Sequence, residues 1–190
     1  MLFWNGRNIL IRISGGKVKG RKINSRRGFF TRPLLSSVRR SLFDVIGDLI
    51  EESKFLDLYA GVGTVGIEAL SRGAREVVFV EKEKVCIQII RQNLFICNCL
   101  SRSRIYQENV LRFLPYLLSK ENFHFIFVGP PYFKGLQDKT LNIIIQVVRG
   151  ETCLIVQHSP KEKINFKRKM VTLIKQKRYG DTFLTFLQIN

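Results

Sequence analysis

The sequence of 190 residues has no apolar run near the ~18 residues that a membrane-spanning helix needs. Its first stretch carries Arg7 and Asn8 among apolar residues and has no small-residue cleavage site, so we expect no signal peptide. It has only four cysteines and two histidines, and the pair Cys97 and Cys99 has no second pair or nearby histidine to complete a zinc site. We therefore expect free, buried thiols in a reducing, cytoplasmic compartment, with no metal site and no membrane association.

Acidic residues are missing from residues 1–40, which hold 11 of the 32 Lys and Arg. Residues 41–160 hold 13 basic and 13 acidic side chains, and residues 161–190 hold eight basic and two acidic ones. The net charge of +17 is thus carried by two basic ends around a neutral body. This placement favours binding of a polyanion at the two ends, with nucleic acid as the first candidate, and binding of a small ligand in the middle. The hydrophobic fraction of 45% excludes a disordered basic chain.

Hydrophobic periodicity divides the chain into a basic arm and an α/β body. Short apolar runs on both sides of the turn at Ser14–Gly16 predict a basic hairpin, so we expect an arm at residues 1–35 and one globular unit at 36–190. The elements expected after the arm are a helix capped by Ser36 or Ser37 that reaches Leu49, a helix from residue 66 to Arg72, the helices Lys82–Cys97, Val110–Leu118 and Leu136–Val148, and the strands Lys54–Tyr59, Glu76–Val80, Arg104–Gln107, His124–Val128, Thr152–Gln157, Met170–Ile174 and Thr182–Ile189.

Five of these strands alternate with helices, which predicts a right-handed, mostly parallel sheet. The last two strands follow each other without a helix and are joined by the polar segment KQKRYGD, so we expect an antiparallel pair. The predicted architecture is a Rossmann-like α/β fold whose seven-stranded sheet ends in a C-terminal antiparallel hairpin. We expect it to be a monomer.

The segment Gly61–Gly66 has the pattern G-x-G-x-x-G and stands between a predicted strand and a predicted helix, the context in which this motif binds nucleotides. Glycines allow a tight turn and a close approach of the backbone to a ligand. Glu81 ends the next strand, 20 residues after Gly61, where a carboxylate can bind both hydroxyls of a ribose. The loop and the acid together predict an adenosine-containing cofactor.

Asp57 distinguishes between two cofactors of this kind. A dinucleotide places a diphosphate over the helix N-terminus, where an acid four residues before Gly61 would repel it. S-adenosylmethionine is cationic at its sulfur and its amino group, so Asp57 favours it. Asn109 follows the third strand of the body, where its side chain either meets the adenine or caps the next helix.

The segment Gly129-Pro130-Pro131-Tyr132 follows a buried strand directly. Ligands of open α/β sheets bind at the carboxyl ends of the strands, so this segment should face the same crevice as the glycine loop. The prolines fix the backbone and expose carbonyl groups. Tyr132 offers a flat ring on which an extruded base can stack.

The segment LDLYAGVGTVGIEALSRGA (Leu56–Ala74) resembles the first motif of the RsmD-type methyltransferases, which use S-adenosylmethionine to methylate N2 of a guanine in bacterial 16S ribosomal RNA. The resemblance covers nearly the whole chain in the order of the family's motifs. The other matching segments are Arg12–Lys17 with Gly20–Lys22, Thr31–Pro33 with Val38-Arg39 and Leu42-Phe43, Val80-Glu81, and Lys177–Thr182.

The resemblance implies a class I S-adenosylmethionine-dependent methyltransferase fold that acts on ribosomal RNA or the small ribosomal subunit. Gly129, Pro130, Pro131 and Tyr132 would then form the catalytic segment. The residues expected to bind the cofactor are Asp57, Tyr59, Gly61, Gly63, Gly66, Glu81, Asn109 and Val110. The cations expected to contact RNA beside the crevice are Arg12, Lys17, Lys19, Arg21, Lys22, Arg32 and Arg39, with Arg26 and Arg27, although Arg32 and Arg39 can instead order the active site.

Two positions depart from the family pattern. Asn109 stands where the family usually has Asp, a mild change because an amide still pairs with an adenine edge. Gly129 stands first in a motif that usually reads (D/N)PP(Y/F), and so it lacks an acceptor for one N–H of the target amine. Loss of such a contact costs about 10²–10³ in rate.

Three explanations of Gly129 are open: a slower enzyme in which a water or another residue supplies the acceptor, a chain that binds RNA without methylating it, or a one-base change from an Asp codon. Three other functions compete with RNA methylation. They are an NAD-dependent oxidoreductase, a non-catalytic ribosome-assembly protein and a DNA amino-methyltransferase.

Overall fold

The computed structural model describes residues 9–25, 34–148, 150–165 and 171–189, so the expectations for Arg26, Arg27 and Arg32 lie outside the described residues. Short 3-10 turns at Gly47–Ile50 and Leu100–Arg102 supplement the main elements. In chain order these are β1 (Ile9–Arg12), β2 (Lys22–Ser25), α1 (Ser36–Ile46), β3 (Lys54–Leu58), α2 (Thr64–Ser71), β4 (Glu76–Glu81), α3 (Lys84–Ile96), β5 (Ser103–Gln107), α4 (Val110–Lys120), β6 (Phe125–Val128), α5 (Leu136–Val147), β7 (Thr152–His158), β8 (Val171–Tyr179) and β9 (Thr182–Ile189).

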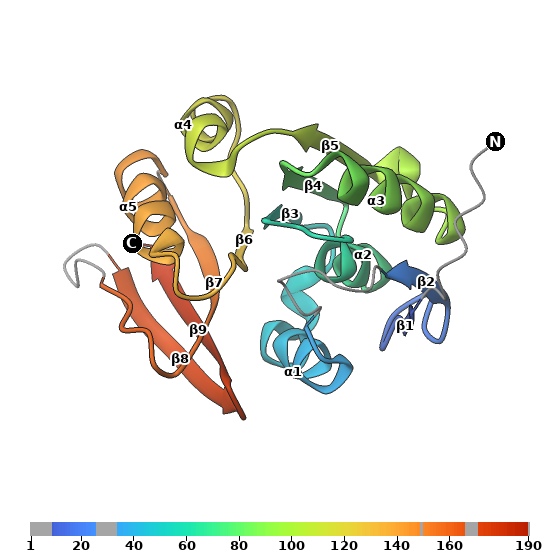
Figure 1. Cartoon of the computed structure of the whole chain (residues 1–190), viewed down its shortest axis with the longest axis horizontal. Helices are drawn as coiled ribbons and strands as arrows, with labels where there is room; N and C mark the ends of the chain where they lie inside the picture. Colours follow the sequence, from blue (N-terminus) through green and yellow to red (C-terminus); the bar gives the residue numbers. More distant parts are fainter. Residues whose placement is uncertain (1–8, 26–33, 149, 166–170, 190) are drawn as a thin grey trace.

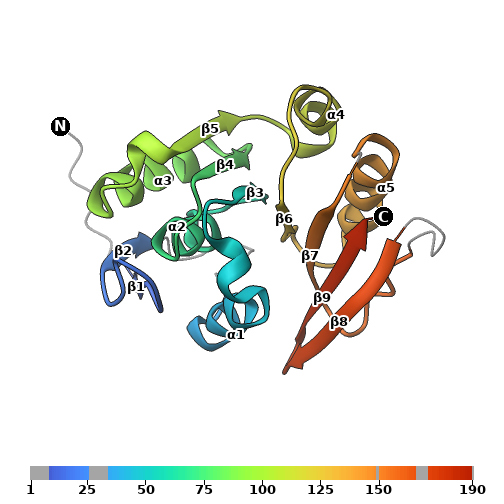
Figure 2. The same cartoon turned by 180° about the vertical axis from the view of Figure 1, so that it is seen from behind.

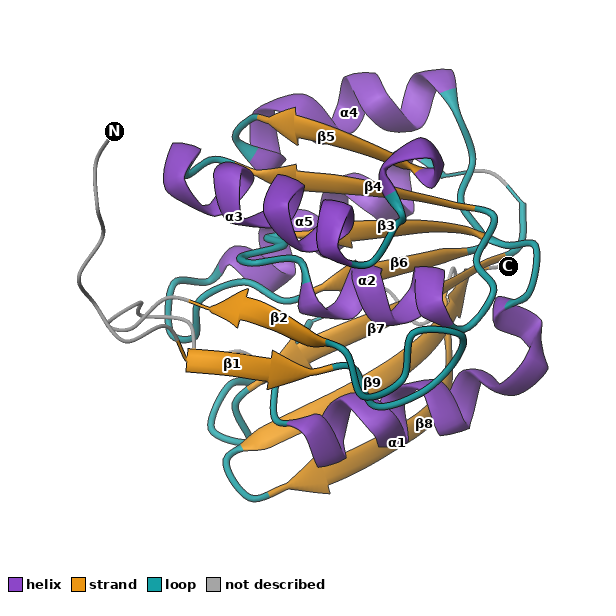
Figure 3. Cartoon of the chain, turned by 90° about the vertical axis from the view of Figure 1, so that its right-hand side faces the viewer, coloured by secondary structure: helices purple, strands orange, loops and turns teal. Residues whose placement is uncertain are grey.

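The main sheet has seven strands in the order β5-β4-β3-β6-β7-β9-β8 (Figure 3). The first five are parallel, whereas β9 pairs antiparallel with both β7 and β8. This confirms the predicted parallel sheet with a C-terminal hairpin. The carboxyl ends of the five parallel strands therefore meet at one edge, and the turn between β8 and β9 lies at that same edge because His158 at the end of β7 pairs with Phe183.

Two hydrophobic clusters hold helices on both faces of the sheet (Figures 1 and 2). One cluster packs α1, α2 and α3 against alternate side chains of the strands, such as Phe55 and Phe79. The other packs α4 and α5 against the intervening side chains, such as Leu56 and Val78. Because both faces are covered, the central strands are mostly apolar. No helix in the described part of the chain is long and apolar enough to cross a membrane.

Two local predictions are wrong. Leu35 holds the N-cap position of α1 and makes no side-chain capping bond, because Ser36 and Ser37 already lie inside the first turn. The last two strands are joined by a much shorter loop than expected, since β8 runs on to Tyr179 and only Gly180 and Asp181 form the turn. As the edge strand, β8 is mostly exposed and therefore tolerates the lysines and glutamine that resemble a loop.

The β1–β2 hairpin packs against α2 and α3 (Figure 3). Ile13 and Ile23 are fully buried in the cluster that also contains α1 and α2. At the hairpin's tip, the N–H of Lys17 donates to the carbonyl of Ser71 at 2.6 Å, and Ser71 Oγ donates to the carbonyl of Gly15. The tip thus rests on the C-terminal end of α2. The boundary of the arm at residue 35 stays a prediction.

Candidate active site

Asp57 lies in β3, directly below the glycine loop, and is fully buried. Its Oδ2 accepts a hydrogen bond from the N–H of Gly66 at 2.9 Å, which ties the first turn of α2 to the strand. Burial raises the pKa of the Asp57 carboxyl from 3.8 to about 8; the bond from Gly66 opposes this shift, and the nearby charge of Glu81 adds to it. A cation placed above the loop would favour the ionised form of this carboxyl.

Glu81 ends β4 beside the same loop and is almost completely buried. Its Oε2 accepts from the N–H of Gly61 at 2.8 Å, and its Oε1 accepts from the N–H groups of Lys82 and Glu83 at 2.9 and 3.0 Å. The carboxylate therefore joins the first glycine of the loop to the end of β4. Since an ionised carboxylate has about four acceptor positions, it can still bind a ribose hydroxyl.

Two further features shape the loop. A Cβ on Gly66 would stand 2.3 Å from Cε1 of Phe79, so only glycine lets α2 pack this closely on β4. Tyr59, with a left-handed φ of 60°, carries the chain from β3 into the loop, and its hydroxyl pairs with Thr140 Oγ1 on α5 at 2.7 Å. A non-glycine residue in this backbone region is a mark of functional sites.

Asn109 holds the N-cap of α4, where its Oδ1 accepts from the N–H of Arg112 at 3.4 Å. The structure shows Asn109 in one of its two expected roles, as the N-cap of α4. Its contact with adenine stays a prediction. The next residue, Val110, begins α4 and is buried in the hydrophobic cluster that packs α4 and α5 against the sheet. Both residues follow β5 and so lie at the same edge of the sheet as the glycine loop.

The segment Gly129–Tyr132 follows β6, next to β3, and so lies at the same edge of the sheet as the glycine loop. The hydroxyl of Tyr132 pairs with Thr182 Oγ1 at 2.9 Å and accepts from Gln157 Nε2 at 2.9 Å. Two strands, β7 and β9, thereby fix the ring of Tyr132.

Sequence reasoning did not identify Gln157, Thr182 or Phe127 as residues around this segment. A Cβ on Gly129 would stand 2.6 Å from Cε1 of Phe127 and 3.4 Å from Oε1 of Gln157. A signal for Gln157 was present, because a polar residue at the carboxyl end of a predicted central strand faces the crevice.

The prediction that Arg39 contacts RNA is contradicted by its burial, because its side chain is 0% exposed. Its Nε donates to Oε2 of Glu68 at 3.0 Å, and its other nitrogens donate to the carbonyls of Leu34 and Arg12. Glu68 also accepts from the N–H and hydroxyl of Ser14. Arg39 is therefore a structural residue that fastens the hairpin and α1 to α2, and its other expected role, ordering the active site, stays a prediction.

The other arm cations within the described residues, which are Arg12, Lys17, Lys19, Arg21 and Lys22, are exposed, as an RNA contact requires. Their position differs from the expectation, however, because Lys17 lies at the C-terminal end of α2 and Arg21 Nη1 donates to the carbonyl of Ile96 at the end of α3. Both helices begin at the sheet edge that carries the glycine loop, so these side chains are about a helix length away from it, roughly 12 Å for α2. Lys19 shares the tip of the hairpin, whereas Arg12 on β1 and Lys22 on β2 stand opposite each other in the strand register. The tip of the arm therefore lies away from that edge.

A second basic segment does lie beside it. Tyr179 at the end of β8 contacts the hydroxyl of Ser41 on α1, and Lys177 Nζ donates to the same hydroxyl at 3.3 Å. Arg178 is exposed next to them. The bond between Thr182 and Tyr132 connects this turn directly to the Gly129–Tyr132 segment.

Replacing Asp57 with asparagine is expected to remove a pH dependence of stability. The folded protein keeps the Asp57 carboxyl protonated up to about pH 8, whereas the unfolded chain ionises it above 3.8, so this group lowers the free energy of unfolding as pH rises through that window. The asparagine variant should therefore gain stability relative to wild type at pH 8 but not at pH 4. Urea unfolding at both pH values measures this, with the exposed Asp48→Asn as control; equal pH slopes for Asp57→Asn and wild type would contradict it.

Comparison with known proteins places this chain in a family. Residues 11–188 match the family model described as Conserved hypothetical protein 95. The Ribosomal RNA small subunit methyltransferase D of Buchnera aphidicola subsp. Acyrthosiphon pisum is 31% identical over 173 residues, which cover 90% of this chain and 89% of the relative. The solved structure of yhhF from Escherichia coli has a TM-score of 0.83 at 26% identity and covers 95% of this chain and 98% of that one.

An RNA methyltransferase from Salinibacter ruber, solved in complex with S-adenosyl-L-homocysteine, shares the fold at 12% identity and a TM-score of 0.66, over 83% of this chain and 94% of that one. The predicted class I methyltransferase fold is thereby confirmed. Since one family model spans nearly all of the chain and a full-length relative exceeds 30% identity, the chain belongs to the Conserved hypothetical protein 95 family, the family of the RsmD-type methyltransferases that its motifs resemble.

Proposed function

We propose that this protein transfers a methyl group from S-adenosylmethionine to the N2 amine of a guanine in small-subunit ribosomal RNA. The observation that carries the proposal is the meeting of two sites at one sheet edge. The glycine loop, held by Asp57 and Glu81, and the Gly129–Tyr132 segment follow the neighbouring strands β3 and β6. One site is suited to an adenosine cofactor and the other to a base.

The residues at the loop fit S-adenosylmethionine. Glu81 offers a carboxylate to the ribose, and the buried Asp57 suits a cationic ligand better than a diphosphate. A Cβ on Gly61 would meet nothing within 4 Å, so the turn is open on the side that a ligand would approach. When bound, the cofactor supplies an electrophilic methyl group. The proposed cofactor residues are Asp57, Tyr59, Gly61, Gly63, Gly66, Glu81, Asn109 and Val110.

The protein's part in the chemistry is to position a weak nucleophile. The lone pair of the guanine amine is delocalised into the ring, so the amine must be turned until that lone pair faces the methyl carbon. Tyr132, fixed by Thr182 and Gln157, provides a ring on which the base can stack. The carbonyl next to Pro130 can accept one N–H of the amine, which stabilises the positive charge that develops on nitrogen.

The RNA contact nearest the target base is proposed to come from Lys177 and Arg178, with the arm cations touching RNA farther from it. Replacing both residues with glutamine should weaken RNA binding and reduce the slope of log K against log salt by about 1–2, because two phosphate contacts are lost. Affinity for S-adenosylhomocysteine should not change. Salt titrations of RNA binding measure the slope.

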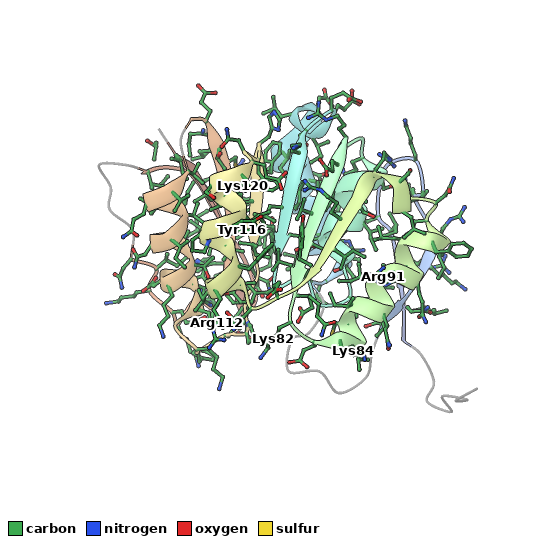
Figure 4. All side chains as sticks on the ribbon, turned by 90° about the horizontal axis from the view of Figure 1, so that it is seen from above. Lys82, Lys84, Arg91, Arg112, Tyr116 and Lys120 are labelled. Carbon is green, nitrogen blue, oxygen red and sulfur yellow. The ribbon has the colours of Figure 1, made fainter. Side chains whose placement is uncertain are left out.

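The matched control for this pair is Arg91→Gln with Lys120→Gln, which removes the same charge from exposed positions on α3 and at the C-terminal end of α4. Figure 4 shows Arg91 on α3, and Lys120 at the far end of α4 from Arg112. An equal loss of RNA affinity in both double variants would mean that only net charge matters and would contradict the proposed contact.

Two assays test the function itself. Isothermal titration with S-adenosylhomocysteine and with NAD distinguishes a methyltransferase from an oxidoreductase; we expect heat only with the first. Labelled methyl transfer to unmethylated small subunits and to duplex DNA then distinguishes an RNA enzyme from a DNA amino-methyltransferase and from a non-catalytic binder. Label in RNA alone is the expected result, and label in DNA or in neither would contradict the proposal.

A further inference from the structure

We infer that the side-chain oxygen of Gln157 supplies the hydrogen-bond acceptor that Gly129 lacks. The inference rests on the proposed function and deepens it. It assigns a catalytic contact to a residue 28 positions farther along the chain, on the neighbouring strand β7. The reaction would then keep two acceptors for the target amine, the carbonyl next to Pro130 and the amide oxygen of Gln157.

Oε1 of Gln157 lies next to the place where a side chain at position 129 would be. Gln157 lies in β7, beside β6, and Oε1 of Gln157 stands 3.4 Å from the point that a Cβ on Gly129 would occupy. The orientation of the amide is fixed from the other end, since Nε2 donates to the hydroxyl of Tyr132 at 2.9 Å. Tyr132 is in turn bonded to Thr182. The oxygen is therefore directed to the place where an Asp or Asn side chain would begin.

The oxygen is also available to a substrate. Among the residues that the structure describes, none donates a hydrogen bond to Gln157 Oε1. Within that same part of the chain every buried side-chain nitrogen or oxygen has a partner, so this atom must be open to solvent. An accessible acceptor with a fixed direction can bind an N–H without first breaking another hydrogen bond.

Phe127 shows why the acceptor was not simply restored at position 129. Its ring occupies the space of a side chain there, with Cε1 at 2.6 Å from the hypothetical Cβ. Phe127 is itself buried between the strands, so the ring cannot move without repacking. Glycine at 129 and phenylalanine at 127 thus form one packing arrangement, and an aspartate needs a smaller residue at 127.

Methyl transfer exchanges a carbon–sulfur bond for a carbon–nitrogen bond. The amine nitrogen forms a bond to the methyl carbon, the carbon–sulfur bond breaks with its electron pair remaining on sulfur, and one N–H proton leaves to solvent. The amide of Gln157 accepts a hydrogen bond throughout and takes no proton, because an amide oxygen is not a base near neutral pH. Its contribution is orientation of the lone pair and stabilisation of developing charge.

A double-mutant cycle on methyl transfer tests the inference. In the wild-type background, Gln157→Leu should lower kcat on the order of 10²-fold, with unchanged affinity for S-adenosylhomocysteine. In the background Phe127→Leu with Gly129→Asp, where the carboxylate supplies the acceptor, the same change should cost less than about 10-fold. Gln157→Glu keeps an oxygen acceptor and should retain more activity than Gln157→Leu.

Thr182→Val is the matched control, because it removes the other hydrogen bond to Tyr132 and leaves the acceptor in place; its kcat should stay well above that of Gln157→Leu. Equal costs of Gln157→Leu in the two backgrounds, or equal kcat for Gln157→Leu and Thr182→Val, would mean that Gln157 only positions Tyr132 and would overturn the inference. If the background with Gly129→Asp does not fold, the comparison among the leucine, glutamate and valine variants decides alone. If the wild-type protein transfers no methyl group, the proposed function is refuted together with the inference. If the wild type is active but Gln157→Leu and Thr182→Val have equal kcat, only the inference is refuted.

Discussion

Replacement of Arg39 with leucine is expected to destabilise the protein by about 3–5 kcal/mol, because it leaves the Glu68 carboxylate buried without its main partner. Both side chains are fully buried, and Arg39 also satisfies two backbone carbonyls that leucine cannot reach. Arg72, whose Nε donates to Glu68 at 3.2 Å, keeps one cation nearby, which favours the lower end of the range. The midpoint of thermal unfolding should fall on the order of 10 °C.

Arg40→Leu is the matched control, since this neighbouring arginine lies on the exposed side of α1. Its free energy of unfolding should change by less than about 1 kcal/mol. A small effect of Arg39→Leu would mean that the arm and α1 dock through their apolar side chains alone. Protease cleavage of the β1–β2 hairpin should also accelerate in Arg39→Leu, because Glu68 joins that hairpin to α2 through Ser14.

Replacement of Glu81 with glutamine is expected to lower the affinity for S-adenosylhomocysteine about 10- to 100-fold. The carboxylate accepts three backbone N–H groups, and an amide in its place must point an NH₂ group at one of those donors. Each hydrogen bond to a charged group contributes about 1.5–3 kcal/mol, and the proposed ribose contact would weaken together with the anchor of Gly61. Isothermal titration measures the change.

Glu83→Gln serves as the control for Glu81→Gln, because its side chain is half exposed and pairs only with Lys82 among the described residues. An affinity loss confined to Glu81→Gln would locate the ribose at the end of β4. Unchanged affinity in Glu81→Gln would contradict the proposed cofactor position, whereas unfolding of that variant would appear separately in its circular dichroism.

The parallel sheet and the edge at which the glycine loop and the Gly129–Tyr132 segment lie could be predicted from the sequence because both depend on local signals. The buried strands are apolar runs, such as Val77–Val80, and the composition of the glycine loop predicts a turn. β8 could not be predicted over its full length, because an edge strand exposed on both faces needs no apolar alternation. The family resemblance indicated which loops are candidates for the chemistry.

Contacts between distant side chains lay beyond sequence reasoning. A count of charges cannot distinguish Arg39, which is buried against Glu68 29 residues away, from the exposed Arg40 beside it. Likewise, the sequence shows only that Gly129 lacks a hydrogen-bond acceptor. It is the pairing of β6 with β7 that brings Gln157 next to the position of the missing side chain. Side-chain partners of this kind depend on strand order and rotamer, which no local pattern specifies.

Identification of the methylated nucleoside tests the proposed methyl transfer. Small subunits that lack the modification would be incubated with the wild-type protein and labelled S-adenosylmethionine, and their RNA digested and separated by mass spectrometry. We predict label in N2-methylguanosine at one position of the small-subunit RNA. Label in another nucleoside, or none despite measured binding of S-adenosylhomocysteine, would contradict the account.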